Sequence, residues 1–232
     1  MYMIKKRNYP TPVWASGVKK KKENSPEPES IEDLDIEGFE NMIRSKVESA
    51  LNPFKEFKGK KNHIYFHEDI TKKTCNNLIG AIEEVSIRIQ KLVSDYDVEP
   101  IPKIYLHISS NGGEILPAFG VMDFIRRSKI PIVTIIEGIA ASAATFISVS
   151  SNERWITQHS YMMIHQLSGG SWGTFSEMED DFVNKKELME RIIKIYEDKT
   201  KMKPAELRSL LKHDLYWNSE ECLKRGLVDR II

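Results

Sequence analysis

From residue 63 onward, short apolar runs alternate with longer amphipathic runs, and this alternation constrains the fold more than any other feature of the chain. The stretches "HIYFH", "KIYLHIS" and "PIVTIIEG" indicate strands, and the last two are nearly continuous apolar runs typical of buried parallel strands. Between the first two, apolar residues recur on one helical face: Leu78, Ile82, Val85, Ile89 and Leu92. Strands that alternate with helices predict an α/β fold with a mainly parallel sheet and right-handed crossovers.

The same alternation continues to the end of the chain. A helix is expected over "AASAATFISVS", and a long one is expected to open at a capping box formed by Ser176 and Glu179. Short strands are expected at "RWIT", at "YMMIH" and in the closing "GLVDRII".

The front of the chain has a different composition. The first 35 or so residues are rich in Pro, Lys, Glu and Ser, and this composition is typical of disordered segments. A short amphipathic helix is expected over residues 36–51, which repeat apolar residues every four positions. We therefore expect an N-terminal extension over 1–60 and one folded domain over 61–232.

Composition limits the partners and the compartment. Lys and Arg number 34 and Asp and Glu also number 34, so no net field favours a nucleic acid or a membrane surface. The chain has no apolar run long enough to cross a bilayer, its start is too polar for a secretory signal, and its 2 cysteines predict no disulfide framework. We expect a cytoplasmic protein; the basic, acid-free first 22 residues leave a transit peptide or nuclear signal as the alternative to a disordered tail.

Three polar residues are candidates for nucleophilic chemistry. Ser142 lies in "GIAASAATF", where small neighbours would let a substrate backbone approach and the start of a helix would supply free N–H groups. His165 ends a predicted strand, and Asp214 precedes aromatic residues that could shield it. A serine nucleophile needs a base and the base needs an orienting acid, but each residue alone could equally be a packing, core-edge or turn residue.

Four stretches together resemble a known family: "SSNGGEI", "GIAASAATF", "YMMIHQLSGGSWGTFSEMED" and "HDLYWNSEECLKRGLVDRI". In this order, over residues 63–232, they are similar to the Clp protease proteolytic subunit (ClpP) family of self-compartmentalised serine peptidases. The resemblance implies that Ser142 is the nucleophile, that His165 is the general base, and that Asp214 orients the imidazole. It also implies that the backbone N–H groups of Gly113 and Ala143 form the oxyanion hole.

The resemblance carries further expectations about architecture and partners. It implies the superhelix of ββα units that the family shares with crotonases. It also implies a handle strand and a long handle helix through which two heptamer-type rings stack into a tetradecamer. The handle corresponds to "HQLSGGSWGTFSEMED", in which Gly169, Gly170 and Gly173 suit a backbone that pairs with substrate or a neighbouring ring. It implies unfolded polypeptide substrates and an ATP-dependent Clp-type unfoldase. We expect no cofactor, and no metal either, since His63 and His67 lie in a strand-like stretch with no evident third ligand.

The chain also departs from the family pattern. Asn111 stands where the family usually has proline, which changes the loop but not its glycine amides. In the family's ATPase-docking cleft, Tyr105, Ile135, Trp155 and Ile232 keep an apolar character, whereas His107, Arg127 and Thr157 do not. Each lost apolar anchor would weaken docking by about 1–3 kcal/mol.

These departures and the long front suggest a divergent member, of a viral or plasmid type. Two other functions stay open from sequence: a catalytically silent ring scaffold and a crotonase-type acyl-CoA enzyme.

Overall fold

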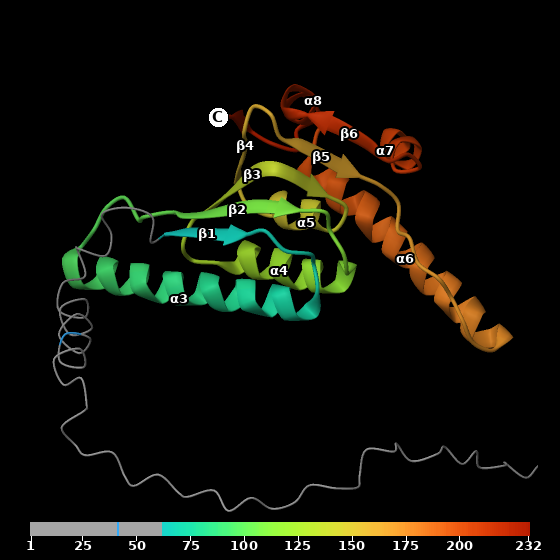
Figure 1. Cartoon of the computed structure of the whole chain (residues 1–232), viewed down its shortest axis with the longest axis horizontal. Coiled ribbons are helices and arrows are strands. Elements are labelled where there is room, and N and C mark those ends of the chain that lie inside the picture. The colour runs from blue at the N-terminus through green and yellow to red at the C-terminus, as the bar shows by residue number, and fades with distance from the viewer. Residues whose placement is uncertain (1–40, 42–61) are drawn as a thin grey trace, which may run out of the picture. The chain divides into compact units, whose positions relative to one another are not determined.

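The structure is a computed structural model and describes Asn41 and residues 62–232 (Figure 1). Apart from Asn41, the predicted extension over 1–60 and its helix over 36–51 lie outside the described residues.

A seven-stranded sheet forms the centre of the described region, and it is mainly parallel, as predicted. Its main path runs in the order β1-β2-β3-β4-β7, and β5 branches from β3 and pairs in turn with β6. All pairings are parallel except that of β5 with β6. The strands are β1 (His63–Phe66), β2 (Ile104–Ser110), β3 (Ile132–Ala141), β4 (Glu153–Ile156), β5 (Tyr161–Ile164), β6 (Leu215–Asn218) and β7 (Arg230–Ile231).

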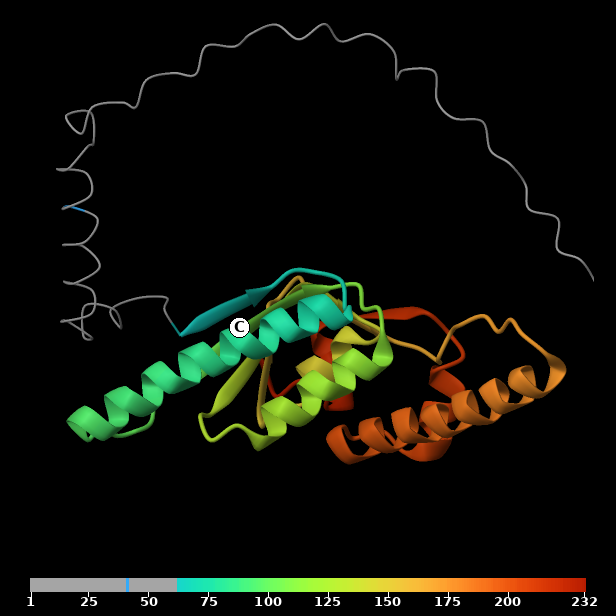
Figure 2. The same ribbon diagram turned by 90° about the horizontal axis from the view of Figure 1, so that it is seen from below.

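Helices connect the strands, and Figures 1 and 2 show α3 and α4 side by side on one face of β1, β2 and β3. The long helix α6 begins beyond the sheet and runs back to it. The helices are α3 (Lys72–Tyr96), α4 (Ile115–Arg127), α5 (Ala144–Ser148), α6 (Phe175–Lys199), α7 (Pro204–Leu210) and α8 (Ser219–Arg225).

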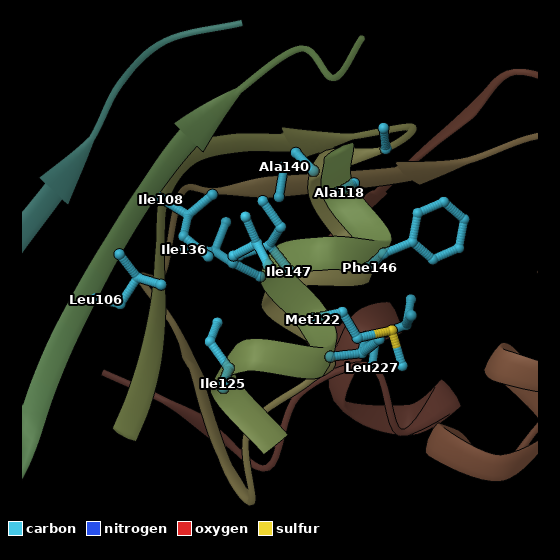
Figure 3. Packing of buried hydrophobic residues seen from close by; sticks show 14 of the residues in the cluster. Leu106, Ile108, Ala118, Met122, Ile125, Ile136, Ala140, Phe146, Ile147 and Leu227 are labelled. Carbon is cyan, nitrogen blue, oxygen red and sulfur yellow. The ribbon is translucent and has the colours of Figure 1, made fainter. Parts of the chain in front are cut away.

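The core lies between the sheet and these helices. All five residues predicted for the inner face of α3 are buried, which confirms that helical pattern. Figure 3 shows side chains of β2, β3 and α4 packed together with Phe146 and Ile147 of the short helix α5. Burial of each large aliphatic side chain contributes roughly 1.5–3 kcal/mol, so α5 is fixed on a closely packed base.

The prediction of a helix from residue 140 is wrong at its start. Strand β3 continues through Ala140 and Ala141, which pair with Met162 and Met163 of β5. Alanine favours helices, but the parallel ladder to β5 outweighs that local preference. Ser142 therefore lies in the turn between β3 and α5 instead of in the first turn of a helix.

The start of α6 also differs from the prediction. Thr174, not Ser176, is the N-cap, because its side chain accepts from Glu177 N while the Glu177 carboxylate accepts from Thr174 N at 2.7 Å. Gly173, at φ +154°, turns the chain immediately before this cap. The local sequence offers two capping boxes, Thr174 with Glu177 and Ser176 with Glu179. Only the path of the chain before the helix decides which one forms.

The predicted handle strand is absent from the described single chain. Residues 166–174 form no strand, although the Lys185 ammonium on α6 donates to Gly170 O at 3.0 Å and to Ser171 Oγ at 2.9 Å. A strand needs a partner for its backbone, and within the chain this segment lies against a helix.

Candidate active site

Three strand ends bring the predicted catalytic side chains together. Ser142 follows β3, His165 follows β5, and Asp214 precedes β6. Strands β3 and β5 are parallel with Ala141 opposite Met163, so both chains leave the sheet at the same edge. The β5–β6 pair is antiparallel with Ile164 opposite Leu215, so the next residues on each side, His165 and Asp214, must also face each other.

Ser142 lies on a sharp turn with a backbone φ of +53°. Only a few per cent of non-glycine residues adopt this left-handed region, so the turn is held by its surroundings. Ser142 N donates to Met163 O at 2.8 Å, and Ser142 O accepts from Thr145 N at 3.0 Å. The turn aims the hydroxyl at the imidazole, with Ser142 Oγ 2.8 Å from His165 Nε2.

The other imidazole nitrogen contacts the acid. His165 Nδ1 lies 2.9 Å from Asp214 Oδ1, which fixes Nδ1–H as the donor when the carboxylate is ionised and leaves Nε2 free to accept from Ser142. The expectation that aromatic residues shield Asp214 is wrong for the single chain, since its side chain is 72% exposed and Tyr216 is also exposed. The reason is the strand β6, which was not predicted: alternation along it turns Trp217 inward and Tyr216 outward.

The two predicted oxyanion donors lie beside the serine. Neither the Gly113 N–H nor the Ala143 N–H donates a hydrogen bond within the part of the chain that the structure describes. The adjacent Gly112 packs against the turn so closely that a Cβ there would lie 2.8 Å from Ser142 Cβ and 3.0 Å from Ala143 N. At Gly113, with φ +143°, a Cβ would lie 2.2 Å from Ile70 O, so only glycine fits this approach.

A pocket of about 170 Å³ contains Ser142, His165, Gly113 and Ala143. The segment after β5 forms the solvent-exposed edge of the pocket. Apolar side chains from several elements line the pocket: Ile115, Phe146, Leu167, Ile192 and Tyr196.

Other reactive groups of the described residues do not compete with this site. Both cysteines are buried, and burial raises the pKa of Cys75 to about 11 and that of Cys222 to about 12, so neither is a thiolate near neutrality. Within residues 62–232 no group of three or more His, Cys, Asp or Glu side chains could hold a metal ion. No helix in that range is long and apolar enough to span a bilayer.

An α/β sheet that presents serine, histidine and carboxylate in hydrogen-bonded succession beside two free amides is typical of serine hydrolases. Sequence comparison gives the family: the Clp protease family model matches residues 56–232, and the chain belongs to that family.

Among curated proteins, the "ATP-dependent Clp protease proteolytic subunit" of Mesostigma viride is 28% identical over 171 residues, covering 73% of this chain and 70% of the relative. The equivalent protein of Deinococcus radiodurans is 30% identical over 149 residues, covering 63% of this chain and 72% of the relative. The "ATP-dependent Clp protease proteolytic subunit 1" of Chlamydia trachomatis serovar D is 27% identical over 175 residues, covering 73% and 85%. Family membership indicates a peptidase.

Proposed function

We propose that this chain is a serine endopeptidase that cleaves unfolded polypeptides with Ser142, His165 and Asp214. The observation that carries the proposal is the unbroken hydrogen-bond succession, 2.8 Å from Ser142 to His165 and 2.9 Å from His165 to Asp214. Both distances are short enough for proton transfer, and the chain has this geometry without a bound substrate.

The geometry supports a two-step acyl transfer. His165 Nε2 takes the Ser142 proton as Oγ bonds to the substrate carbonyl carbon, and Asp214 stabilises the resulting imidazolium. The negative charge on the carbonyl oxygen develops between the Gly113 and Ala143 N–H groups. His165 then gives the proton to the leaving amine, and a water activated by the same imidazole hydrolyses the acyl-enzyme.

The pocket favours extended chains with an apolar residue before the cleaved bond. Its volume of about 170 Å³ and its walls of Phe146, Ile192 and Leu167 suit one apolar side chain. The neighbouring residues 166–174 form no strand among the described residues. Some of their backbone groups are already bonded, since Gln166 N donates to Leu211 O and Gly170 O accepts from Lys185, and the remaining backbone groups of the segment can pair with a substrate strand. Folded proteins cannot present such a strand, so small peptides should be cut without ATP and folded proteins should need an unfolding partner.

The handle supports assembly into stacked rings, heptamer-type and most simply a tetradecamer. The first half of α6 carries exposed apolar side chains, and Trp172, just before the helix, is fully exposed. Contiguous exposed apolar surface marks contact sites, and a second copy offers the same surface in return. The residues are Phe175, Met178, Phe182 and Val183.

Docking of a Clp-type ATPase is the remaining part of the proposal, suggested by the names of the relatives. On the sheet face away from α3 and α4, Tyr65 stacks on His107 with ring centroids 4.4 Å apart, and Tyr105 lies near Trp155. His107 is buried and bonds to Glu137 at 2.7 Å, so it contributes a fixed polar group where an apolar anchor is expected. We expect docking, but weaker than for a fully apolar cleft, and a cytoplasmic location alongside such an ATPase.

Labelling with a fluorophosphonate tests the function. The probe should attach to Ser142, shown by peptide mass spectrometry, and Ser142→Ala should abolish labelling and lower peptide hydrolysis by about 10⁴-fold or more. Ser168, the other serine of the pocket, is the internal control.

The alternatives give different results. A silent ring scaffold would not label at all, and a crotonase-type enzyme would act on acyl-CoA without needing Ser142. Attachment of the probe to Ser168, or labelling that survives in Ser142→Ala, would contradict the assigned nucleophile. The native mass of the purified particle tests the rings, and a peptidase found only as a monomer would refute the chamber.

A further inference from the structure

A second hydrogen-bond succession reaches the backbone carbonyl of Ser142. The Thr145 hydroxyl donates to Ser142 O at 2.5 Å and lies 2.6 Å from the Tyr196 hydroxyl on α6. Thr145 and Tyr196 are both buried, with 0% and 1% of their surfaces exposed. The His165 mechanism uses neither side chain.

The direction of each hydrogen bond follows from chemistry. A carbonyl oxygen only accepts, so the single Thr145 hydroxyl proton must go to Ser142 O. Tyr196 must therefore donate to Thr145 Oγ1. Burial raises the pKa of Tyr196 far above its usual value, so its hydroxyl stays protonated and keeps this role at every working pH.

The carbonyl at the end of this succession belongs to the peptide group that carries the Ala143 N–H. A peptide group is planar and trans, so its C=O and N–H point in opposite directions. Two donors from Thr145 hold the oxygen toward the protein interior, and the N–H must then point away from it, toward the pocket that Ala143 lines. Hydrogen bonds to the oxygen also polarise the N–H and make it a stronger donor.

We propose that Thr145 and Tyr196 are positioning residues that aim and polarise the Ala143 amide toward the substrate oxyanion. This inference rests on the proposed peptidase function, since it assigns Ala143 to the oxyanion hole. It adds a buried polar pair on α5 and α6 to the residues that set the rate. The shared feature is that both hydroxyls act through one backbone peptide.

Two independent substitutions test it. Tyr196→Phe removes only the terminal hydroxyl, and Thr145→Val replaces the hydroxyl with a methyl of similar size. Complete loss of an oxyanion donor costs about 10²–10³ in kcat, so a misaimed donor should cost roughly tenfold for Thr145→Val and somewhat less for Tyr196→Phe. KM for a short peptide should stay within about twofold, because the interaction strengthens only in the transition state.

Further readouts separate positioning from general damage. Thr145→Ser keeps the hydroxyl and should restore most of kcat. The midpoint of the acid limb of kcat/KM against pH should not move, because His165 and Asp214 are untouched. A peptide boronic acid, which places a charged oxygen in the oxyanion hole, should lose affinity in proportion to kcat/KM.

The matched control is Thr134→Val. Thr134 is a buried threonine whose hydroxyl donates to Ser148 O at 2.7 Å, at the far end of the same short helix α5. It should lower the thermal midpoint about as much as Thr145→Val does, and leave kcat unchanged.

The outcomes are distinguishable. If the wild-type chain hydrolyses peptides and both Thr145→Val and Tyr196→Phe keep its kcat, the inference is overturned and the proposed function stands. If Thr134→Val lowers kcat as much as Thr145→Val, the effect is structural and the inference is also overturned. A folded wild-type particle with no hydrolysis and no fluorophosphonate labelling would overturn the proposed function, and this inference with it.

Discussion

The two ends of helix α6 have opposite surroundings. Near its C-terminus, Ile192, Ile193 and Tyr196 are buried, and Tyr196 bonds to Thr145, close to Ser142. Near its N-terminus, Phe175 and Phe182 are 72% and 69% exposed. Figures 1 and 2 show the N-terminal half of the helix extending away from the sheet.

The difference shows which parts of this chain are complete within one copy. The C-terminal end of α6 together with the predicted catalytic residues Ser142, His165 and Asp214, here called the catalytic end, has its hydrogen bonds made, its pocket formed and its core packed within residues 62–232. The N-terminal end of α6 with Phe175 and Phe182, here called the handle end, leaves apolar side chains in water, at a cost of roughly 25 cal/mol for each Å² that a partner could cover. Substitutions at the catalytic end should therefore change rate or chain stability, and those at the handle end should change assembly.

After the loss expected for Ser142→Ala, the largest effect is expected from Gly113→Ala, beside Ser142. The new Cβ would lie 2.2 Å from Ile70 O, so the backbone must shift and the Gly113 N–H would miss the oxyanion. Steady-state kinetics should show kcat lowered by about 10²–10³, with the native mass unchanged.

Gly120→Ala on α4 is the control, because a Cβ there meets no atom within 4 Å and should be neutral or slightly stabilising. If Gly113→Ala kept full kcat, the Gly113 amide would not be an oxyanion donor.

The next largest effect separates the two ends by stability. Ile193→Ala removes a buried side chain near the C-terminus of α6 and should lower the free energy of unfolding by about 2–5 kcal/mol. Val183→Ala, at a position 62% exposed in the single chain near the other end, should stay within about 0.5 kcal/mol when the dissociated chain is unfolded. Urea unfolding of both variants measures the contrast, and equal losses would mean that Val183 is also packed.

The sequence predicted the inner face of α3 and the residues of the candidate site, because these signals are local or are carried by the family motifs. The α3 face from Leu78 to Leu92 follows from helical periodicity, and the structure confirms it. Ser142, His165 and Asp214 were named from the motifs, and the structure brings them into hydrogen-bond contact. Their catalytic roles stay predictions.

The errors occur where a non-local contact decides. Ala140 and Ala141 favour a helix but join β3, because β5 lies beside them. Strand β6 was missed because "LYWN" is short and its partner β5 is about fifty residues away in the sequence. Tyr196 and Thr145 carried no signal, since their hydroxyls meet only after α6 packs on α5.

A third prediction concerns the handle. Phe175→Ser together with Phe182→Ser should lower the native mass of the particle, because stacking would lose two exposed apolar anchors on each copy. The free energy of unfolding of the dissociated single chain should change by less than about 0.5 kcal/mol per substitution. Mass photometry or ultracentrifugation gives the first quantity, and urea unfolding gives the second.

Ile87→Ser is the matched control, since Ile87 is 65% exposed on α3 and away from the handle. The double variant should still label at Ser142 if the catalytic end is complete in one chain. A particle of unchanged mass would refute the assignment of the handle as the stacking surface.

The smallest effect is expected at the cap of α6 and depends on pH. Thr174→Ala removes the side chain that accepts from Glu177 N, and should reduce hydrogen-exchange protection of the first turn by about threefold to tenfold at pH 7. Ser176→Ala is the control, because the Ser176 side chain makes no hydrogen bond within the described residues and should not reduce protection.

The pH dependence comes from Glu177, whose pKa is lowered first by its hydrogen bond from the Thr174 backbone and then by that from the Thr174 hydroxyl. A depressed carboxyl pKa means stabilisation that is complete above the ordinary Glu value of about 4.3 and is lost as pH falls through the folded-state pKa. Glu177→Gln should therefore weaken protection of this turn at pH 7, and its difference from wild type should vanish as the pH drops below that value. A difference that persists in acid would mean that the charge of Glu177 is not its source, and no difference at pH 7 would assign the cap to the Thr174 side chain alone.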